Sequence, residues 1–266
     1  MSIATAAKEL PQIELGGLHL HALTEAQCVE HILSELRELR GGWVVTPNLD
    51  HLRRFQGDRE FQELVGQADL ITADGMPLIW FSRLQGTPLP ERVAGSSLIS
   101  TVSSAAAQEG RSIYLMGGDP GTAEEAGRIL CERYPGLRLA GTSCPKVGST
   151  IDEATRQSLV AELERLQPDI IFVGLGSPKQ ERLIAALKSS LPHAWWLGVG
   201  ISFSFVCKRV RRAPRWMQKL GLEWVHRLWQ EPRRLAKRYL VDGLPFAALM
   251  FVRCGWRRMF GRRNVS

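Results

Sequence analysis

Cysteine is scarce in this chain, and long apolar runs are missing. The 266 residues include five cysteines, which form no CxxC pair and stand near no histidine cluster. This scatter argues against a disulfide framework and against a zinc site, and it indicates a reducing compartment. The sequence does not open with a basic segment and a long apolar stretch, so we expect no signal peptide. No apolar run reaches the roughly 20 residues that a membrane-spanning helix needs. We therefore expect a cytoplasmic protein.

Several catalytic signatures are also missing. Neither a Walker A loop nor a GxGxxG fingerprint is present, which argues against a nucleoside triphosphatase and against a dehydrogenase. There is no GxSxG elbow, and the six histidines show no HxxxH spacing. We expect these histidines to be structural or surface residues.

What the chain does have is a marked charge asymmetry. Residues 1–207 carry 18 Lys and Arg against 24 Asp and Glu, a net charge of −6, whereas residues 208–266 carry 16 against 3, a net charge of +13. A basic tail (residues 208–266) on an acidic body (residues 1–207) indicates a local polyanionic partner. Phosphate groups, an anionic membrane surface and nucleic acid are the candidates.

Strand-like apolar segments alternate with amphipathic helical ones. A hairpin is predicted over Ile13–Ala22, and a helix follows that opens with a capping box at Thr24 and Gln27 and ends at Gly41-Gly42. The predicted core strands are Trp43–Val45, Leu70–Thr72, Ser112–Met116, Arg138–Ala140, Ile170–Val173 and Trp195–Val199. The predicted helices between them include Ser97–Gln108, Thr122–Tyr134, Asp152–Leu166 and Lys179–Leu191. This alternation predicts an α/β fold, a Rossmann-like and mostly parallel sheet with helices on both faces.

The pattern changes past Phe205, and we predict a domain boundary near residue 207. A basic connector, Lys208 to Pro214, leads to two predicted helices, Trp216–Arg227 and Pro232–Val241. The segment Leu244–Phe260 then combines an apolar stretch, Leu244 to Val252, with arginines. We expect a catalytic domain over residues 1–207 and a basic, helical, membrane-associating appendage over residues 208–266.

Polar and glycine-rich segments follow the predicted strands, where an open parallel sheet binds its ligands. These segments hold Thr46, Asn48, Asp74, Gly117, Gly118, Gly174, Gly176, Ser177, Gln180, Gly198 and Gly200. Glycines and free N–H groups at the start of a helix can bind a phosphate. Alternatively, these glycines only form tight strand-to-helix turns.

Asp74 has two interpretations. A carboxylate at the end of a strand is well placed to act as a general base, but Asp is also a favoured N-cap for the helix that follows. Similarly, Thr46 and Asn48 could hydrogen-bond a sugar or could simply be turn residues around Pro47. Arg92 could bind a diphosphate or form an exposed ion pair. The residue types alone leave these alternatives open.

Taken together, seven segments in order resemble the WecG/TagA/CpsF family, glycosyltransferase family 26. They are Thr46-Pro47-Asn48, Ala68–Met76, Glu91–Gly95, Gly117–Gly121, Phe172–Glu181, Gly198–Gly200 and Lys208–Gln230. The resemblance implies an inverting enzyme that moves a sugar from a UDP donor to a polyprenyl-diphosphate-linked saccharide at the inner face of the membrane, during synthesis of a surface polysaccharide or wall polymer.

The resemblance also implies roles for individual residues. Asp74 would be the catalytic base, Thr46 and Asn48 would orient sugar or acceptor, and Arg92 and Gln180 would contact donor or substrate. Arginines of the appendage, with Arg227 and Arg234 as the best candidates, would meet the charge of the leaving diphosphate. Because no DxD pair is present and arginines suit phosphate geometry, we expect no metal ion and no cofactor.

One position departs from the family pattern. Ser204 stands where the family usually has an acid, which leaves the donor sugar open: N-acetylmannosamine, its uronic acid and glucose all occur in the family. The acceptor and the oligomeric state also stay open, and a homo-oligomer is compatible with the sequence. Two other functions are retained as alternatives, a nucleotide-sugar hydrolase and a non-catalytic basic module that binds membrane or RNA. We favour the membrane over nucleic acid because the tail is amphipathic.

Overall fold

The computed structural model describes residues 10–148 and 150–260. Strands β1 (Gln12–Leu15) and β2 (Leu18–His21) form the predicted antiparallel hairpin. Helix α1 (Glu25–Arg37) begins with the predicted capping box, in which Thr24 accepts from the Gln27 N–H and Gln27 accepts from the Thr24 N–H. The helix stops at Glu38 instead of Gly41-Gly42, because the chain turns at Leu39, whose φ is +56°.

All six predicted core strands are confirmed, and together they form one parallel sheet. The strands are β3 (Gly42–Val45), β4 (Leu70–Ile71), β5 (Ser112–Gly117), β6 (Arg138–Ser143), β7 (Ile170–Gly174) and β8 (Trp195–Gly198), in the order β4-β3-β8-β7-β5-β6. From β3 the chain moves outward to β4, whereas the later strands lie on the β8 side. The carboxyl ends of β3 and β8 therefore flank the point where the strand order reverses, the usual ligand-binding position of such sheets.

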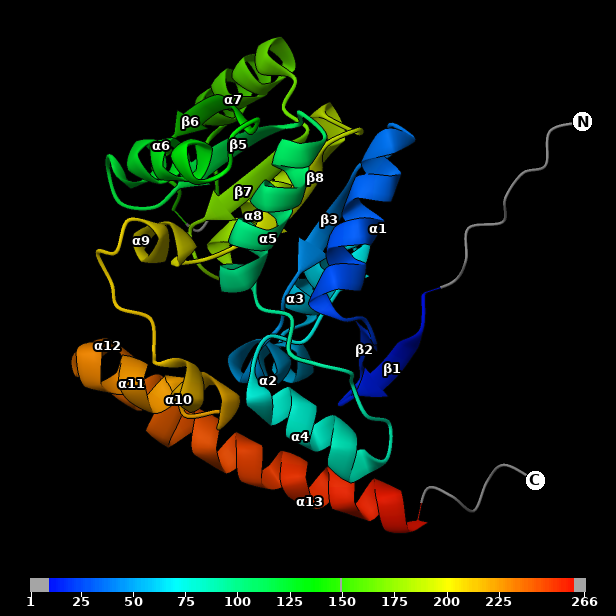
Figure 1. The fold of residues 1–266 in the computed structure, drawn as a ribbon. Coiled ribbons are helices and arrows are strands. Elements are labelled where there is room, and N and C mark those ends of the chain that lie inside the picture. The colour runs from blue at the N-terminus through cyan, green and yellow to red at the C-terminus, as the bar shows by residue number, and fades with distance from the viewer. Residues whose placement is uncertain (1–9, 149, 261–266) are drawn as a thin grey trace, which may run out of the picture.

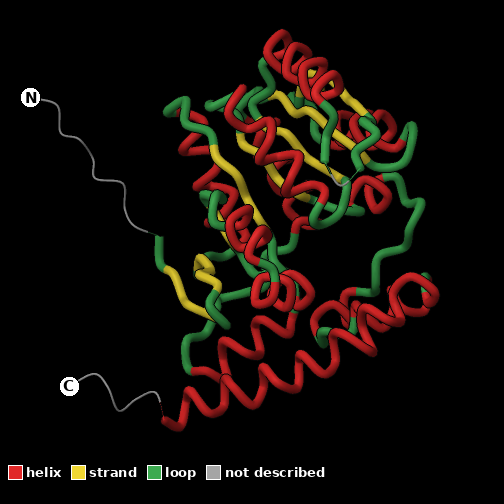
Figure 2. Tube along the Cα trace, turned by 180° about the vertical axis from the view of Figure 1, so that it is seen from behind, coloured by secondary structure: helices red, strands yellow, loops and turns green. Residues whose placement is uncertain are grey.

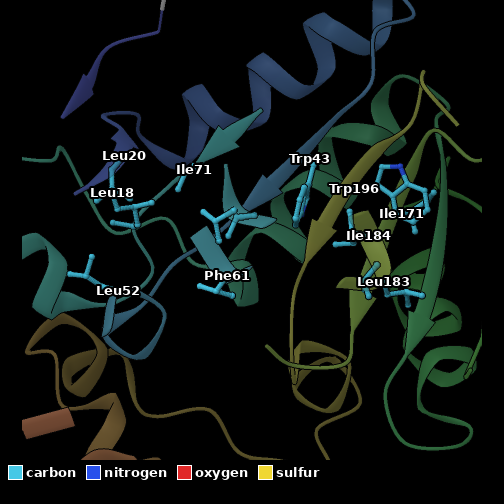
Figure 3. Close-up of a cluster of buried hydrophobic side chains, with 14 of the residues drawn as sticks. Leu18, Leu20, Trp43, Leu52, Phe61, Ile71, Ile171, Leu183, Ile184 and Trp196 are labelled. Atoms are coloured by element: carbon cyan, nitrogen blue, oxygen red, sulfur yellow. The ribbon is translucent and has the colours of Figure 1, made fainter. Parts of the chain in front are cut away.

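Helices cover both faces of the sheet, as predicted (Figures 1 and 2). One face packs against α1, α5 (Gly95–Gln108), α6 (Thr122–Arg133) and the short α9 (Ser202–Val206). The other face packs against α2 (Leu49–Gly57), α3 (Arg59–Val65), α7 (Glu153–Leu166), α8 (Lys179–Leu187) and the hairpin. A single 3-10 turn, Lys188–Ser190, extends α8. Each face has its own hydrophobic core: the first core lies under α1, α5, α6 and α9, and the second lies under α2, α3, α7, α8 and the hairpin. Successive strand residues alternate between these cores. Trp196 and Ile171 therefore lie in the second core (Figure 3), while Trp195 and Ile170 lie in the first.

The C-terminal residues form an additional helical layer next to α4 (Met76–Gln85). An extended connector leaves α9 and leads to α10 (Arg215–Lys219) and α11 (Glu223–Gln230); α12 (Pro232–Ala236), a π-helical turn (Lys237–Gly243) and α13 (Leu244–Phe260) follow (Figures 1 and 2). The single helix predicted over Trp216–Arg227 is broken at Gly221, whose φ is +70°. Among the described residues, no helix is both long and apolar enough to span a bilayer.

Helix α13 is bound to the body of the protein. Met250 and Cys254 are buried in the second core, and the Phe251 ring contacts the Phe81 ring of α4 edge-on at 4.8 Å. The predicted apolar stretch Leu244 to Val252 is therefore divided: one side packs inward, and the other side stays exposed. Arg262 and Arg263, which the sequence adds to the basic end of this segment, lie outside the described residues.

Candidate active site

Asp74 lies beside the segment that follows β3. After β4 the chain continues alongside its neighbour, with the Thr72 N–H donating to Val45 O (3.0 Å) and the Asp74 N–H donating to Pro47 O (2.7 Å). These hydrogen bonds hold Asp74 next to Thr46-Pro47-Asn48. The N-cap of α4 is Gly75, and no side chain caps this helix. The interpretation of Asp74 as an N-cap is therefore wrong.

The carboxylate of Asp74 faces a guanidinium in a partly buried environment. Its Oδ1 lies 3.6 Å from Arg92 Nη1, and 28% of its side chain is exposed. Burial raises the pKa of Asp74 from 3.8 to about 6; Arg92 lowers it, Glu223 raises it, and His51 and Arg212 lower it. Asp74 is thus reachable from solvent. The pKa of its carboxyl group is closer to neutral pH than that of an ordinary aspartate, as a general base requires.

Two residues of the basic C-terminal part extend the ion pair between Asp74 and Arg92. Glu223 of α11 lies 2.9 Å from Arg92 Nη1 and 3.8 Å from Arg212 Nε. Arg212, in the connector, also donates to Ser97 Oγ of α5 at 3.2 Å. Asp74, Arg92, Arg212 and Glu223 therefore form one cluster of two carboxylates and two guanidiniums.

Asn48 has a structural role at the start of α2. Its Oδ1 accepts from the N–H groups of Asp50 (3.0 Å) and His51 (3.2 Å), and His51 Nδ1 accepts in return from the Asn48 N–H (3.3 Å). This capping box fixes the position of Asn48. Asn48 lies near Gly75: a Cβ added at Gly75 would be 3.8 Å from the Asn48 Cβ. A contact of Asn48 with a sugar stays a prediction.

Gln180 holds the loop after β8. Its Oε1 accepts from the Gly200 N–H at 3.1 Å, and its Nε2 donates to Glu181 Oε1 at 3.0 Å. A Cβ on Gly198 would lie 2.6 Å from Gln180 Nε2, so this close packing requires glycine. Gln180 is buried. A contact of Gln180 with donor or substrate stays a prediction.

Glu181 and His51 form a buried polar pair, and His51 is close enough to Asp74 to lower the pKa of that carboxyl group. His51 Nε2 lies 3.7 Å from Glu181 Oε1, and Glu181 is almost fully buried. Burial alone would raise the pKa of Glu181, but the interactions of its carboxylate with His51 and Gln180 outweigh this effect and leave the pKa below its ordinary value. The pair links α2, which carries Asn48, to α8, which carries Gln180.

The glycines differ in what surrounds them. A Cβ at Gly117 would contact the Leu175 side chain at 2.8 Å, and one at Gly118 or Gly174 would contact the Phe203 ring at 3.1 or 2.8 Å. These three glycines thus allow close packing, as the turn interpretation predicts. Gly176 and Gly200 have positive φ and nothing within 4 Å of an added Cβ, so they leave open space beside the site. The Ser177 Oγ next to Gly176 is buried and has no hydrogen-bond partner among the described residues.

Thr46 meets the loop after β8 at the first turn of α5. A Cβ on Gly95 would lie 3.2 Å from Thr46 Oγ1 and 3.1 Å from Gly198 O. The carboxyl ends of β3 and β8 therefore approach each other at Gly95, close to where the Val93 N–H donates to Ala73 O (2.9 Å). Thr46, Asn48, Asp74, Arg92, Gln180, Gly198 and Gly200 belong to one connected region.

The two predicted tail arginines lie elsewhere. Arg234 of α12 forms an ion pair with Glu231, and Arg227 is in the last turn of α11. No contact described for either residue joins it to Asp74; Arg212 is the tail arginine that does approach the site. A separate cavity of about 690 Å³ lies between the hairpin turn and α13, and none of the predicted site residues lines it.

Sequence reasoning missed four residues of this region: His51, Glu181, Arg212 and Glu223. Three of them had a signal, since Glu181, Arg212 and Glu223 lie inside segments quoted for the family resemblance. His51 had only its position three residues after Asn48, the spacing of a capping box. Among the described residues, no group of three or more His, Cys, Asp or Glu is arranged to hold a metal ion.

The chemistry available here is that of a base next to cations. A carboxylate with a raised pKa can accept a proton, and guanidiniums can stabilise a developing phosphate charge. Comparison with known proteins identifies the family of the chain. The Glycosyl transferase WecG/TagA/CpsF family matches residues 13–260, which include the sheet, the Asp74 region and the helical tail. The family uses, in general, a nucleotide-sugar donor and a glycan acceptor. This chain therefore belongs to the WecG/TagA/CpsF family of glycosyltransferases.

Proposed function

We propose that this glycosyltransferase moves a sugar from a UDP-sugar to a polyprenyl-diphosphate-linked saccharide, with inversion at the anomeric carbon and without a metal ion. The observation that carries the proposal is Asp74, a partly exposed carboxylate with a pKa of about 6 that lies 3.6 Å from Arg92 at the carboxyl edge of the sheet. Family membership supports the transfer of a sugar, and the chemistry of the site supports the finer assignment.

The proposed reaction is a single displacement. Ionised Asp74 takes the proton of the acceptor hydroxyl, and the acceptor oxygen attacks the anomeric carbon from the side opposite to UDP. The new carbon–oxygen bond forms as the bond to the diphosphate oxygen breaks, so the electron pair leaves with UDP. One displacement inverts the configuration, and Asp74 ends the step protonated.

Cations are needed where the diphosphate leaves. Arg92 and Arg212 already lie at the Asp74 cluster, and guanidinium groups bind phosphate oxygens in a bidentate fashion. Arg227 and Arg234 remain candidates for the same task, although Arg234 would first have to release Glu231. Thr46, Asn48 and Gln180 would orient the sugars from the edges of the site.

We further propose that the appendage, from about residue 208 onward, holds the enzyme at the cytoplasmic face of the membrane. Apolar side chains stay exposed along its helices: Trp216, Leu220, Trp229, Val241, Leu244, Val252, Trp256, Met259 and Phe260. Exposed apolar residues next to a charge of +13 favour a peripheral position on an anionic lipid surface. The lipid-linked acceptor would then lie within reach of Asp74.

The test is a donor screen with a synthetic polyprenyl-diphosphate saccharide, measured as UDP release and as product. UDP release that needs no acceptor would indicate a nucleotide-sugar hydrolase instead. Activity must persist in excess EDTA, and NMR of the product must show the inverted anomer. Failure of every UDP-sugar to react would overturn the assignment of the donor.

A further inference from the structure

Glu223 of the tail and the proposed base, Asp74, contact the same nitrogen atom of Arg92. Arg92 Nη1 lies 2.9 Å from Glu223 Oε2 and 3.6 Å from Asp74 Oδ1. The two carboxylates therefore compete for the same guanidinium, and Glu223 is the closer partner. Arg212 is the second cation of the cluster, and its Nε is 3.8 Å from Glu223 Oε1.

The cluster is sheltered from solvent. The exposed fractions of its four side chains lie between 17% and 28%. Arg212 Nε is buried and has no hydrogen-bond partner among the described residues, so this ion pair is its nearest compensation. Charges in such surroundings depend strongly on one another, because removing one leaves its partner uncompensated.

From this geometry we propose that Glu223 is a positioning residue, which fastens the tail over the site through Arg92 and Arg212 and which sets the proton affinity of Asp74. The proposal rests on the proposed role of Asp74 as base. It extends that role by making the strength of the base depend on whether the tail is docked.

The physical reason is the division of the Arg92 charge. While Glu223 is in place, Arg92 compensates Asp74 only in part, and Glu223 itself repels the Asp74 charge. Without Glu223, the Arg92 guanidinium interacts with Asp74 alone, and the repulsion from the Glu223 charge is gone. Each of these two changes stabilises the ionised Asp74 carboxylate. The other charged groups that face Asp74 are His51 of α2 and Arg212 of the connector, and both already favour the ionised form. Asp74 is thus a stronger base with the tail docked.

The test measures the proton affinity of Asp74 directly, by carboxyl carbon-13 NMR over a pH series of the full chain. Glu223→Gln is expected to lower the pKa of Asp74 by at least about 0.5 unit. Glu223→Asp keeps the charge and should lower it less. Glu125→Gln is the matched control: Glu125 forms another ion pair with the C-terminal part, at 2.6 Å from Arg209, and its loss should leave Asp74 unchanged.

The acidic limb of the pH–rate profile should move in the same direction and by the same amount. An unchanged pKa in both Glu223 variants would overturn the proposal, and so would equal shifts in Glu223→Gln and Glu125→Gln. The NMR measurement needs no turnover. A protein that transfers no sugar but shows the shift would refute the proposed function alone, while an active protein without the shift would refute this inference alone.

Discussion

Asp74 occupies a position that suits catalysis better than stability. Its main chain is fixed by Pro47, and its charge is poorly solvated and only partly compensated by Arg92. Asp74→Asn keeps the shape of the side chain but removes the proton acceptor. We expect kcat to fall by at least about 10²-fold. The measurement is UDP release in the presence of acceptor. Asp152→Asn, at the N-cap of α7, is the control and should keep full activity because Asn is also a good cap.

The same carboxylate predicts a defined pH dependence. Its pKa rises from 3.8 to about 6 on folding, so the native state favours the protonated form. The contribution of Asp74 to the free energy of unfolding is therefore fully present below pH 4 and is lost as the pH rises through 6. Asp74→Asn should therefore be more stable than the wild type at pH 8, by up to about 3 kcal/mol, and equally stable below pH 4. Urea unfolding at both pH values tests this; a variant less stable than the wild type at pH 8 would contradict it.

Individual site residues were predictable where they follow strands. Asp74, Thr46 and Asn48 all come directly after apolar segments, and parallel strands bring such positions to one edge. The partners of Arg92 were not predictable in this way, because Glu223 is 131 residues away and belongs to another layer. The capping role of Asp74 was wrong for a local reason: Gly75, with a φ of +130°, turns the chain and itself starts α4.

At the scale of elements, the strands were easier to predict than the tail helices. Buried parallel strands appear as short apolar runs between amphipathic helices, and all six were found. The tail lacks such contrast, since its apolar residues face both the body and the solvent. A continuous helical pattern over Trp216–Arg227 therefore concealed the break at Gly221.

Gly221, which lies between α10 and α11, packs closely against α4. Its φ is +70°, and an added Cβ would lie 2.6 Å from the Trp80 ring and 2.8 Å from the Met76 Cβ. Gly221→Ala should therefore lower the free energy of unfolding by roughly 1–3 kcal/mol and loosen the tail. Urea unfolding and trypsin cleavage in the connector would show this. Gly255→Ala in α13 is the control, because nothing lies within 4 Å of its added Cβ and alanine favours a helix.

At the scale of the whole molecule, the tail has an inner surface that packs on the body and an outer surface that we propose contacts the membrane. Its inner surface is joined to the body by buried side chains of α13 and by ion pairs such as Arg238–Asp50 at 3.0 Å and Arg257–Glu14 at 3.0 Å. Removing the tail would therefore expose the core that it covers, as well as remove Glu223 from Arg92. Point substitutions on the outer surface would therefore test the proposed membrane binding without disturbing the site.

The outer surface of α13 supplies the last prediction. Val252 is 67% exposed, and Val252→Gln should weaken binding to anionic vesicles by about tenfold, because burial of a valine side chain in lipid contributes roughly 1.5 kcal/mol. Leu39→Gln is the matched control, since Leu39 is 75% exposed but lies outside the tail. Vesicle flotation measures the binding, and turnover on a water-soluble acceptor should be unchanged in both variants. Both substitutions replace an exposed aliphatic side chain by the same amide, so only their location differs. Equal flotation of the two variants would mean that the exposed apolar row of the tail does not contact lipid, and a different surface would then have to bring Asp74 to its acceptor.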